Sequence, residues 1–358
     1  LAPVIPDEEK AKTTLLQSHP YQLWAKLNND FAALNRLTEE KSGKEGEASV
    51  IYMEEVNLAI QNVYGLLKYI KDSQDIGQTA LKTAKDRIQL NDADAIYALH
   101  RISARLPQPM DRLVGKIADE SWNVIFLEAI KEIDRKWNND VYSEFNRNLA
   151  HKYPFNPTAK TDVSLEEFED FFGKNGVIDR FYQNELKPFL EESLFKSKQG
   201  DSYRSLVQAD VLIQLENAQR IQKAFFNNKG VLGVEFTMSP LSMGAQAQRS
   251  LLNIEGQYVE YMHGPRRTYA LIWPNTINSK GNQENSVKLT LSGLRGGTIN
   301  SMTYNGPWAL FRMLDQSHIS SVNNNTLDIG FTIKNISMRY QLTAQGEINP
   351  FTLSLLRS

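Results

Sequence analysis

The stretch Gly230-Val231-Leu232-Gly233-Val234-Glu235-Phe236-Thr237-Met238 marks the point where the apolar pattern of the chain changes. From here apolar residues occupy every second position, as a strand with one buried face requires: Leu232, Val234, Phe236 and Met238. Before Gly230 they recur at steps of three and four, which is the spacing of one helix face. The sequence therefore predicts an α+β fold, with an N-terminal all-helical domain and a C-terminal antiparallel β-sandwich.

Further alternating runs follow over 269–273, 287–291, 327–333 and 336–342. Clusters rich in Asn, Gly and Pro separate these runs, and such clusters favour turns. Several short strands at this spacing are typical of a β-sandwich. One short helix is predicted inside the sandwich, from Trp308 to Leu314, because Pro307 suits the first position of a helix.

The first 229 residues read as successive helices. Their apolar stripes are Leu23, Leu27, Phe31 and Leu34; Tyr52 to Ile70; 77–90; 92–104; Ile130, Ile133, Trp137, Val141, Phe145 and Leu149; and Val207 to Phe225. Leu106-Pro107-Gln108-Pro109 interrupts them, and Asn227 to Gly230 is expected to close the last one with a glycine cap. We expect three parts: a helical domain over 1–152, a helical subdomain over 153–229 and the sandwich over 230–358.

Length and composition narrow the class of protein. The 358 residues exceed one ordinary core, and the balance of 40 basic against 42 acidic residues argues against a dominant nucleic-acid binder. No apolar run approaches the roughly 18 residues that cross a bilayer, so we expect no membrane span in this chain. Cysteine is absent, which removes disulfides, thiolate nucleophiles and Cys-ligated zinc. The chain starts at Leu1 without a signal-peptide pattern, so we expect a fragment of a longer protein.

The motifs of common catalytic and metal sites are missing. The histidines are scattered, with no pair three or four positions apart: His19, His100, His151, His263 and His318. The glycine-rich Gly293 to Gly297 follows a predicted strand, so it is interpreted as a turn. Only Asp315 and Asp328 occur among the aspartates after residue 229, too few for a calcium site. We therefore predict no enzyme activity, no cofactor, no metal and no catalytic residues.

Three side-chain groups are interpreted as structural. Ser164-Leu165-Glu166-Glu167 is a capping box, so the acidic residues Glu166, Glu167, Glu169 and Asp170 are expected to serve a helix start rather than a metal. Trp308, Phe311 and Leu314 are expected to anchor the short helix onto a sheet. Phe168, Phe171, Phe172 and Phe181 are expected to form one cluster that joins the two halves of the chain.

Several segments together resemble the IcmF/TssM family. In chain order they are Tyr153-Pro154-Phe155-Asn156-Pro157, Val163-Ser164-Leu165 with Phe168, Phe171-Phe172-Gly173, Gly176 to Phe181, Ile254 to Gln257, His263-Gly264-Pro265, Ile272-Trp273-Pro274, Gly306 to Arg312, and Asn349-Pro350-Phe351. Each is weak alone, but their order over 153–351 is specific. The helices before residue 150 are compatible with the same family, so the resemblance covers nearly the whole chain.

The resemblance implies the C-terminal periplasmic region of a bacterial inner-membrane secretion protein, helical and then C2-like, from a type VI or a type IVB (Dot/Icm) system. Family members carry their membrane spans and a P-loop region upstream, so nothing about nucleotide binding transfers to this chain. They engage a DotU-like inner-membrane partner, and type VI members also engage an outer-membrane lipoprotein. No motif decides between the two systems, and a homo-oligomer stays open.

Three functions remain open from the sequence. The first is a non-catalytic periplasmic scaffold that links inner-membrane and outer-membrane parts of a secretion complex through protein contacts, with unknown interface residues. The second is an envelope- or carbohydrate-binding module, for which Tyr258, Tyr261 and Trp273 would have to form an exposed row of aromatic rings. The third is a hydrolase with a buried carboxylate pair, for which no motif speaks.

Overall fold

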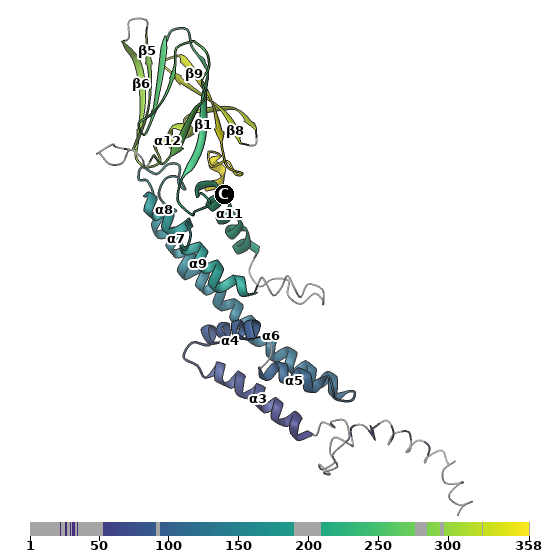
Figure 1. Ribbon diagram of the computed structural model, residues 1–358. Helices are drawn as coiled ribbons and strands as arrows, with labels where there is room; N and C mark the ends of the chain where they lie inside the picture. Colours follow the sequence, from purple (N-terminus) through teal and green to yellow (C-terminus); the bar gives the residue numbers. More distant parts are fainter. Residues whose placement is uncertain are drawn as a thin grey trace, which may run out of the picture. The chain divides into compact units, whose positions relative to one another are not determined.

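The computed structural model (Figure 1) describes residues 53–90, 94–189, 209–275, 285–293, 297–323 and 325–357, and six single positions between 22 and 34. The chain divides into two compact units, Leu1–Glu132 and Ile133–Ser358. Leu23 and Leu27 of the predicted first stripe lie outside the described residues, whereas Phe31 and Leu34 are described as helical. The division into two units reflects how compactly the chain packs and does not show which parts fold independently. The bounds of the three domains expected from the sequence therefore stay a prediction.

The first unit is built from helices joined by short turns, and none of its described residues lies in a strand. Its helices are α3 (Met53–Lys71), α4 (Ile76–Leu90), α5 (Ala95–Ser103) and the first part of α6 (Met110–Lys136). One core joins them, formed by small and branched side chains such as Val56, Val63, Ile96, Leu99 and Ile125. The start of α5 is fixed by Asp94, whose carboxylate accepts a hydrogen bond from the backbone N–H of Tyr97 at 2.6 Å.

The second unit begins within α6 and continues through further helices to a sandwich. A π-helical stretch, η2 (Trp137–Tyr142), interrupts the predicted long helix before α7 (Ser143–Asn148). The helices that follow are α8 (Leu165–Phe172), α9 (Val177–Phe181), η3 (Tyr182–Leu186) and α11 (Ala209–Phe225). The predicted capping box of α8 is confirmed: the Ser164 hydroxyl accepts from Glu167 N–H at 3.0 Å, and Glu167 accepts from Ser164 N–H at 2.9 Å.

The predicted antiparallel β-sandwich is confirmed, and Figure 1 shows its two layers. The five-stranded sheet has the order β4-β1-β9-β8-β7, and the four-stranded sheet has the order β3-β2-β5-β6. The strands are β1 (Val234–Met243), β2 (Arg249–Ile254), β3 (Gln257–Tyr261), β4 (Tyr269–Trp273), β5 (Ser286–Ser292), β6 (Thr298–Asn305), β7 (His318–Asn323), β8 (Thr326–Ile333) and β9 (Ile336–Ala344). The inserted helix is α12 (Ala309–Asp315), and η5 (Leu353–Leu356) lies near the end of the chain.

Two local predictions need correction. Helix α11 ends at Phe225, so Gly230 does not cap it; Gly230 has φ +77° and closes a turn in which its N–H donates to Asn227 O at 2.8 Å. This turn brings Phe226 and Leu232 together in an isolated β-bridge. Helix α12 starts one residue later than predicted, with Trp308 as its N-cap, so Pro307 lies before the helix rather than in its first turn.

Candidate functional site

The feature that most distinguishes the second unit is a junction between its helices and its sandwich. Its centre is a set of aromatic rings in mutual contact, from the loop after α7, from α8, from the end of α11, from β4 and from α12. The set comprises Phe155, Phe168, Phe172, Phe225, Trp273, Trp308 and Phe311. Aromatic contacts at these distances add to the free energy of burial, so the junction is a continuous core rather than a flexible hinge.

Trp308 lies at the middle of this junction. Its ring is 5.1 Å from that of Phe168 and 5.0 Å from that of Trp273, measured between centroids. Its indole Nε1–H donates to Val163 O at 2.8 Å, and the side chain is fully buried. The prediction that Trp308, Phe311 and Leu314 anchor the short helix is confirmed, because all three are buried.

The predicted phenylalanine cluster forms in part. Phe168, Phe171 and Phe172 pack against one another, and Phe168 continues the contacts to Phe225 and Trp308. Phe181 does not belong to it, because its ring packs edge-on against Trp137 at 5.3 Å. Phe181 of α9 points toward η2 instead. The spacing of the phenylalanines along the sequence does not predict which neighbouring element each ring contacts.

Charged groups reinforce one side of the junction. Arg312 of α12 donates from Nε to Asp162 Oδ1 at 3.0 Å and from Nη2 to the same carboxylate and to Ala159 O. Its guanidinium also lies 4.0 Å from the ring centroid of Tyr153. Arginine suits this position because its planar group can stack on a ring while it donates several hydrogen bonds.

Tyr153 and Asp315 connect this side to the end of the chain. The Tyr153 hydroxyl donates to Asp315 Oδ2 at 2.8 Å, and Arg357 pairs with both oxygens of the same carboxylate. Burial, and then the hydrogen bond to Asp315, raise the pKa of Tyr153 above its usual value. Phe351, between the sandwich and this pair, packs on Phe236 of β1 and Phe311 of α12. The last residues therefore fasten the sandwich to the helices.

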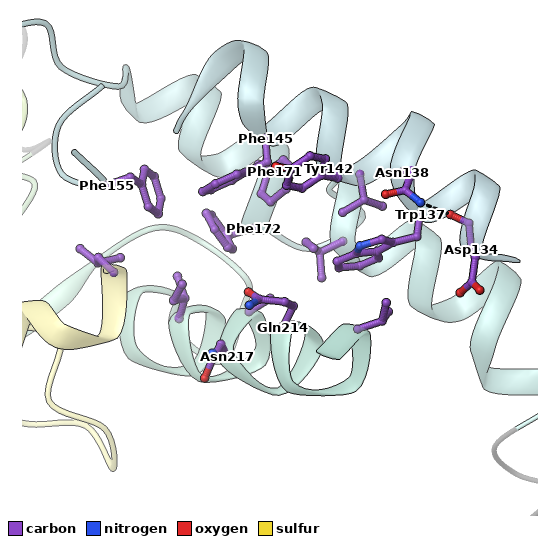
Figure 2. Close-up of a pocket in the computed structure, with 16 residues that line it drawn as sticks. Asp134, Trp137, Asn138, Tyr142, Phe145, Phe155, Phe171, Phe172, Gln214 and Asn217 are labelled. Carbon is purple, nitrogen blue, oxygen red and sulfur yellow. Dashed lines mark hydrogen bonds between the residues drawn. The ribbon is translucent and has the colours of Figure 1, made fainter. Parts of the chain in front are cut away.

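A groove lies beside the junction, between η2, α8 and α11 (Figure 2). Its volume is about 500 Å³. Apolar and aromatic side chains form most of its walls: Trp137, Val141, Phe145, Phe171, Phe172 and Ile221. Asp134, Asn138, Gln214 and Asn217 supply the polar groups. Neither the groove nor the polar side of the junction was anticipated from the sequence, because both depend on which helix faces meet.

The remaining sequence candidates do not form a site. His100 lies near Asp119 at 3.0 Å, and His263 contacts Ala247 O at 2.7 Å, so both have local partners. Gly293 and Gly297 are joined by a backbone hydrogen bond of 3.0 Å, consistent with a turn. Among the described residues, no group of three or more metal-ligating side chains gathers. None of the described helices is long and apolar enough to cross a membrane.

The acidic residues of α8 behave as the capping interpretation predicts. Glu167 pairs with Lys152 Nζ at 2.6 Å in addition to closing the capping box. The hydrogen bond from Lys152 and the backbone N–H of Ser164 hold the pKa of Glu167 below its usual value. Glu166, Glu169 and Asp170 are exposed.

The exposed aromatic row that carbohydrate binding would need does not form from Tyr258, Tyr261 and Trp273. Tyr258 is 55% exposed, but Trp273 is fully buried in the junction. Its indole N–H donates to Pro307 O at 3.2 Å, so the ring serves packing between sheet and helix. Tyr261 is half-buried and faces His263. These three residues offer no common exposed surface.

Comparison with known proteins agrees with this architecture. Two family models match the chain in order: the type VI secretion protein IcmF helical domain over residues 128–228, and the type VI secretion protein IcmF C2-like domain over residues 236–346. The type VI secretion system component TssM1 of Pseudomonas aeruginosa is 27% identical over 330 residues. That alignment covers 91% of this chain and 29% of TssM1, so the chain spans under a third of its relative.

Solved structures share the fold. A chain of a type VI secretion system membrane core complex matches with a TM-score of 0.74 at 17% identity, over 92% of this chain and 69% of that one. The C-terminal domain of the T6SS protein TssM from EAEC matches with a TM-score of 0.51 at 19% identity, over 64% of this chain and 95% of that domain. Since the two consecutive IcmF models together cover more than half of its residues, the chain belongs to the IcmF/TssM family of type VI secretion proteins.

Proposed function

We propose that the chain is a non-catalytic, periplasmic part of a type VI secretion membrane complex. It holds the sandwich in a fixed position on its supporting helices and links inner-membrane to outer-membrane parts through protein contacts. The observation that carries this proposal is the junction around Trp308, where a buried tryptophan joins the loop before α8 to the helix inserted in the sandwich. A close-packed core transmits displacement instead of absorbing it, which is what a scaffold requires.

Exposed apolar side chains support the role in protein contacts. On α6, Leu113, Val124 and Leu127 are each at least half exposed. They lie 11 and 3 positions apart, which places all three on one face of the helix. Large apolar side chains gathered on one face favour a partner protein. We propose that another protein of the same complex packs on this face of α6, and that protein can be a second copy of this chain.

The sandwich offers a second means of contact. Strands β4 and β7 form the edges of one sheet, and β3 and β6 those of the other. Edge strands present unpaired backbone groups, to which a partner can add a strand. We propose that the sandwich binds an outer-membrane lipoprotein. We propose that the upstream part of the full-length protein binds a DotU-like partner.

Crosslinking in cells followed by purification of the intact membrane protein tests the proposed function. Recovery of envelope proteins of the secretion system is expected, whereas recovery of soluble metabolic enzymes alone would refute the scaffold role. Protease added to spheroplasts tests the location, because a periplasmic chain is cut while the inner membrane is still sealed. Protection from the protease until the membrane is dissolved would refute the periplasmic assignment.

A further inference from the structure

The groove of Figure 2 has one charged group among its described lining residues, and that group is Asp134. Asp134 Oδ1 is buried and has no hydrogen-bond partner. A buried carboxylate oxygen without a hydrogen-bond donor is unfavourable. A ligand that enters the groove and donates a hydrogen bond to this oxygen would therefore bind favourably. Burial raises the pKa of Asp134, and no basic side chain contributes to that shift.

The backbone around Asp134 is unusual. The π-helical stretch η2 starts three residues after it, and Ser143 stabilises this stretch through a hydrogen bond of 2.7 Å from its hydroxyl to Asn138 O. Single π-helical turns inside α-helices occur frequently at functional sites. Here Trp137, Asn138, Val141 and Tyr142 of this stretch all line the groove. The irregular turn therefore shapes the wall next to the unpartnered Oδ1 of Asp134.

The side chains that line the groove determine which other chemical groups a ligand needs besides a hydrogen-bond donor. Figure 2 shows Asp134 and Trp137 at one end of the groove, and the rings of Phe145, Phe171 and Phe172 further along it. The volume of about 500 Å³ lies within the usual range for small-molecule sites. Aromatic walls favour an apolar body, and the Trp137 ring beside the carboxylate favours a cation over a neutral donor.

We propose that this groove binds a small amphipathic amine, with its apolar body against the aromatic walls and its ammonium group on Asp134. The proposal is independent of the scaffold role, since it concerns a ligand rather than a partner protein. No covalent step is involved: the ammonium donates hydrogen bonds to the carboxylate, and apolar surface is removed from water.

A matched series of three probes tests the proposal on the full chain. 4-Phenylbutylamine, 4-phenylbutanol and 4-phenylbutyrate share one apolar body and differ in the charge of the head group. In ligand-observed NMR titrations at pH 8, we expect the amine to bind at least fivefold more tightly than the alcohol, and the carboxylate most weakly. Equal binding of all three probes, or no binding of the amine, would overturn the proposal.

Variants locate the site. Asp134→Asn should abolish the preference for the amine while the alcohol binds as before, and Asp140→Asn, which removes an exposed carboxylate of η2 outside the groove, should keep the preference. Gln214→Trp replaces an exposed lining residue of α11 with a ring that fills the groove, and should weaken all three probes at least tenfold. Unchanged binding to a folded Gln214→Trp protein would place the probes elsewhere and refute the site. The probe series needs no variant, so it stays decisive if a substitution prevents folding.

Discussion

Arg357 forms a two-pronged ion pair with Asp315: Nη1 donates to Oδ1 at 3.0 Å, and Nη2 donates to Oδ2 at 2.6 Å. Its Nε lies 3.3 Å from Pro154 O, in the loop that precedes α8. One guanidinium near the end of the chain thus holds the C-terminal end of α12 and the helical part together. The planar fork of arginine matches a carboxylate in this way, whereas lysine presents a single ammonium.

Replacing Arg357 should lower the stability of the second unit. Because the pair is partly exposed, we expect Arg357→Ala to lower the free energy of unfolding by about 1 kcal/mol, and Arg357→Lys to recover less than half of that loss. Urea denaturation followed by tryptophan fluorescence measures the change. Arg339→Ala is the control, since its guanidinium lies 3.9 Å from Asp328 and is about half exposed. Equal losses for the two alanine variants would contradict the role of Arg357.

Trp308→Phe tests the junction itself. The ring contacts with Phe168 and Trp273 are largely kept, but Val163 O loses the buried donor that it has in the native protein. We expect a loss of about 2 kcal/mol, from one unsatisfied carbonyl and the smaller ring. Equilibrium unfolding in urea measures it. A variant as stable as the native protein would show that the hydrogen bond is unimportant.

Gly306→Ala should destabilise the junction for a backbone reason. Gly306 has φ +103°, a conformation that side chains disfavour, and an added Cβ would collide with the Asp162 carboxylate that Arg312 binds. We expect a loss of about 1–3 kcal/mol, measured as a lower thermal midpoint. Gly233→Ala is the control, because no atom lies within 4 Å of its added Cβ. If both variants lose the same amount, neither the collision nor the backbone conformation matters.

Much of the fold was predictable because it depends on local patterns. Alternation of apolar residues identified β1, β4, β5, β8 and β9, whose inward faces are buried. Strand β6 was not predicted, because none of its residues is fully buried and its apolar residues do not alternate. The start of α8 was predictable since a capping box is a contact between residues three apart.

The candidate site was less predictable because it depends on contacts between distant residues. The burial of Trp308 followed from its apolar spacing, but its acceptor Val163 lies 145 positions earlier. The alternation over 269–273 suited a buried Trp273, but it did not show that the ring would pack against the helices at the junction. The groove depends on how η2, α8 and α11 pack, which periodicity does not determine.

Limited proteolysis tests the predicted start of the sandwich domain at residue 230. Lys229 is exposed in the turn that follows α11, so trypsin should cut there early and produce a β-rich fragment that begins at Gly230, held to the helical part by the junction until the two are separated. Mass spectrometry and circular dichroism of the fragment measure the outcome. Lys229→Gln should slow this cut without changing the others. First cuts inside β1 to β9, or a helical fragment, would contradict the domain bounds.

The pH dependence of stability should carry a contribution from Glu255, in the tight turn between β2 and β3. Glu255 Oε1 is buried without a partner, and burial raises the pKa of this carboxyl although Asn275 N–H donates to Oε2 at 2.7 Å. A raised native pKa means that the unfolded chain loses this proton first as pH rises. The contribution is therefore complete below about pH 4.3 and is lost as pH rises through the native pKa. Glu255→Gln removes this loss, so its free energy of unfolding relative to the native protein should increase from pH 4 to pH 7, whereas the exposed Glu347→Gln controls for removal of a charge. Parallel pH profiles for native protein and Glu255→Gln would show that the buried carboxyl does not titrate with folding.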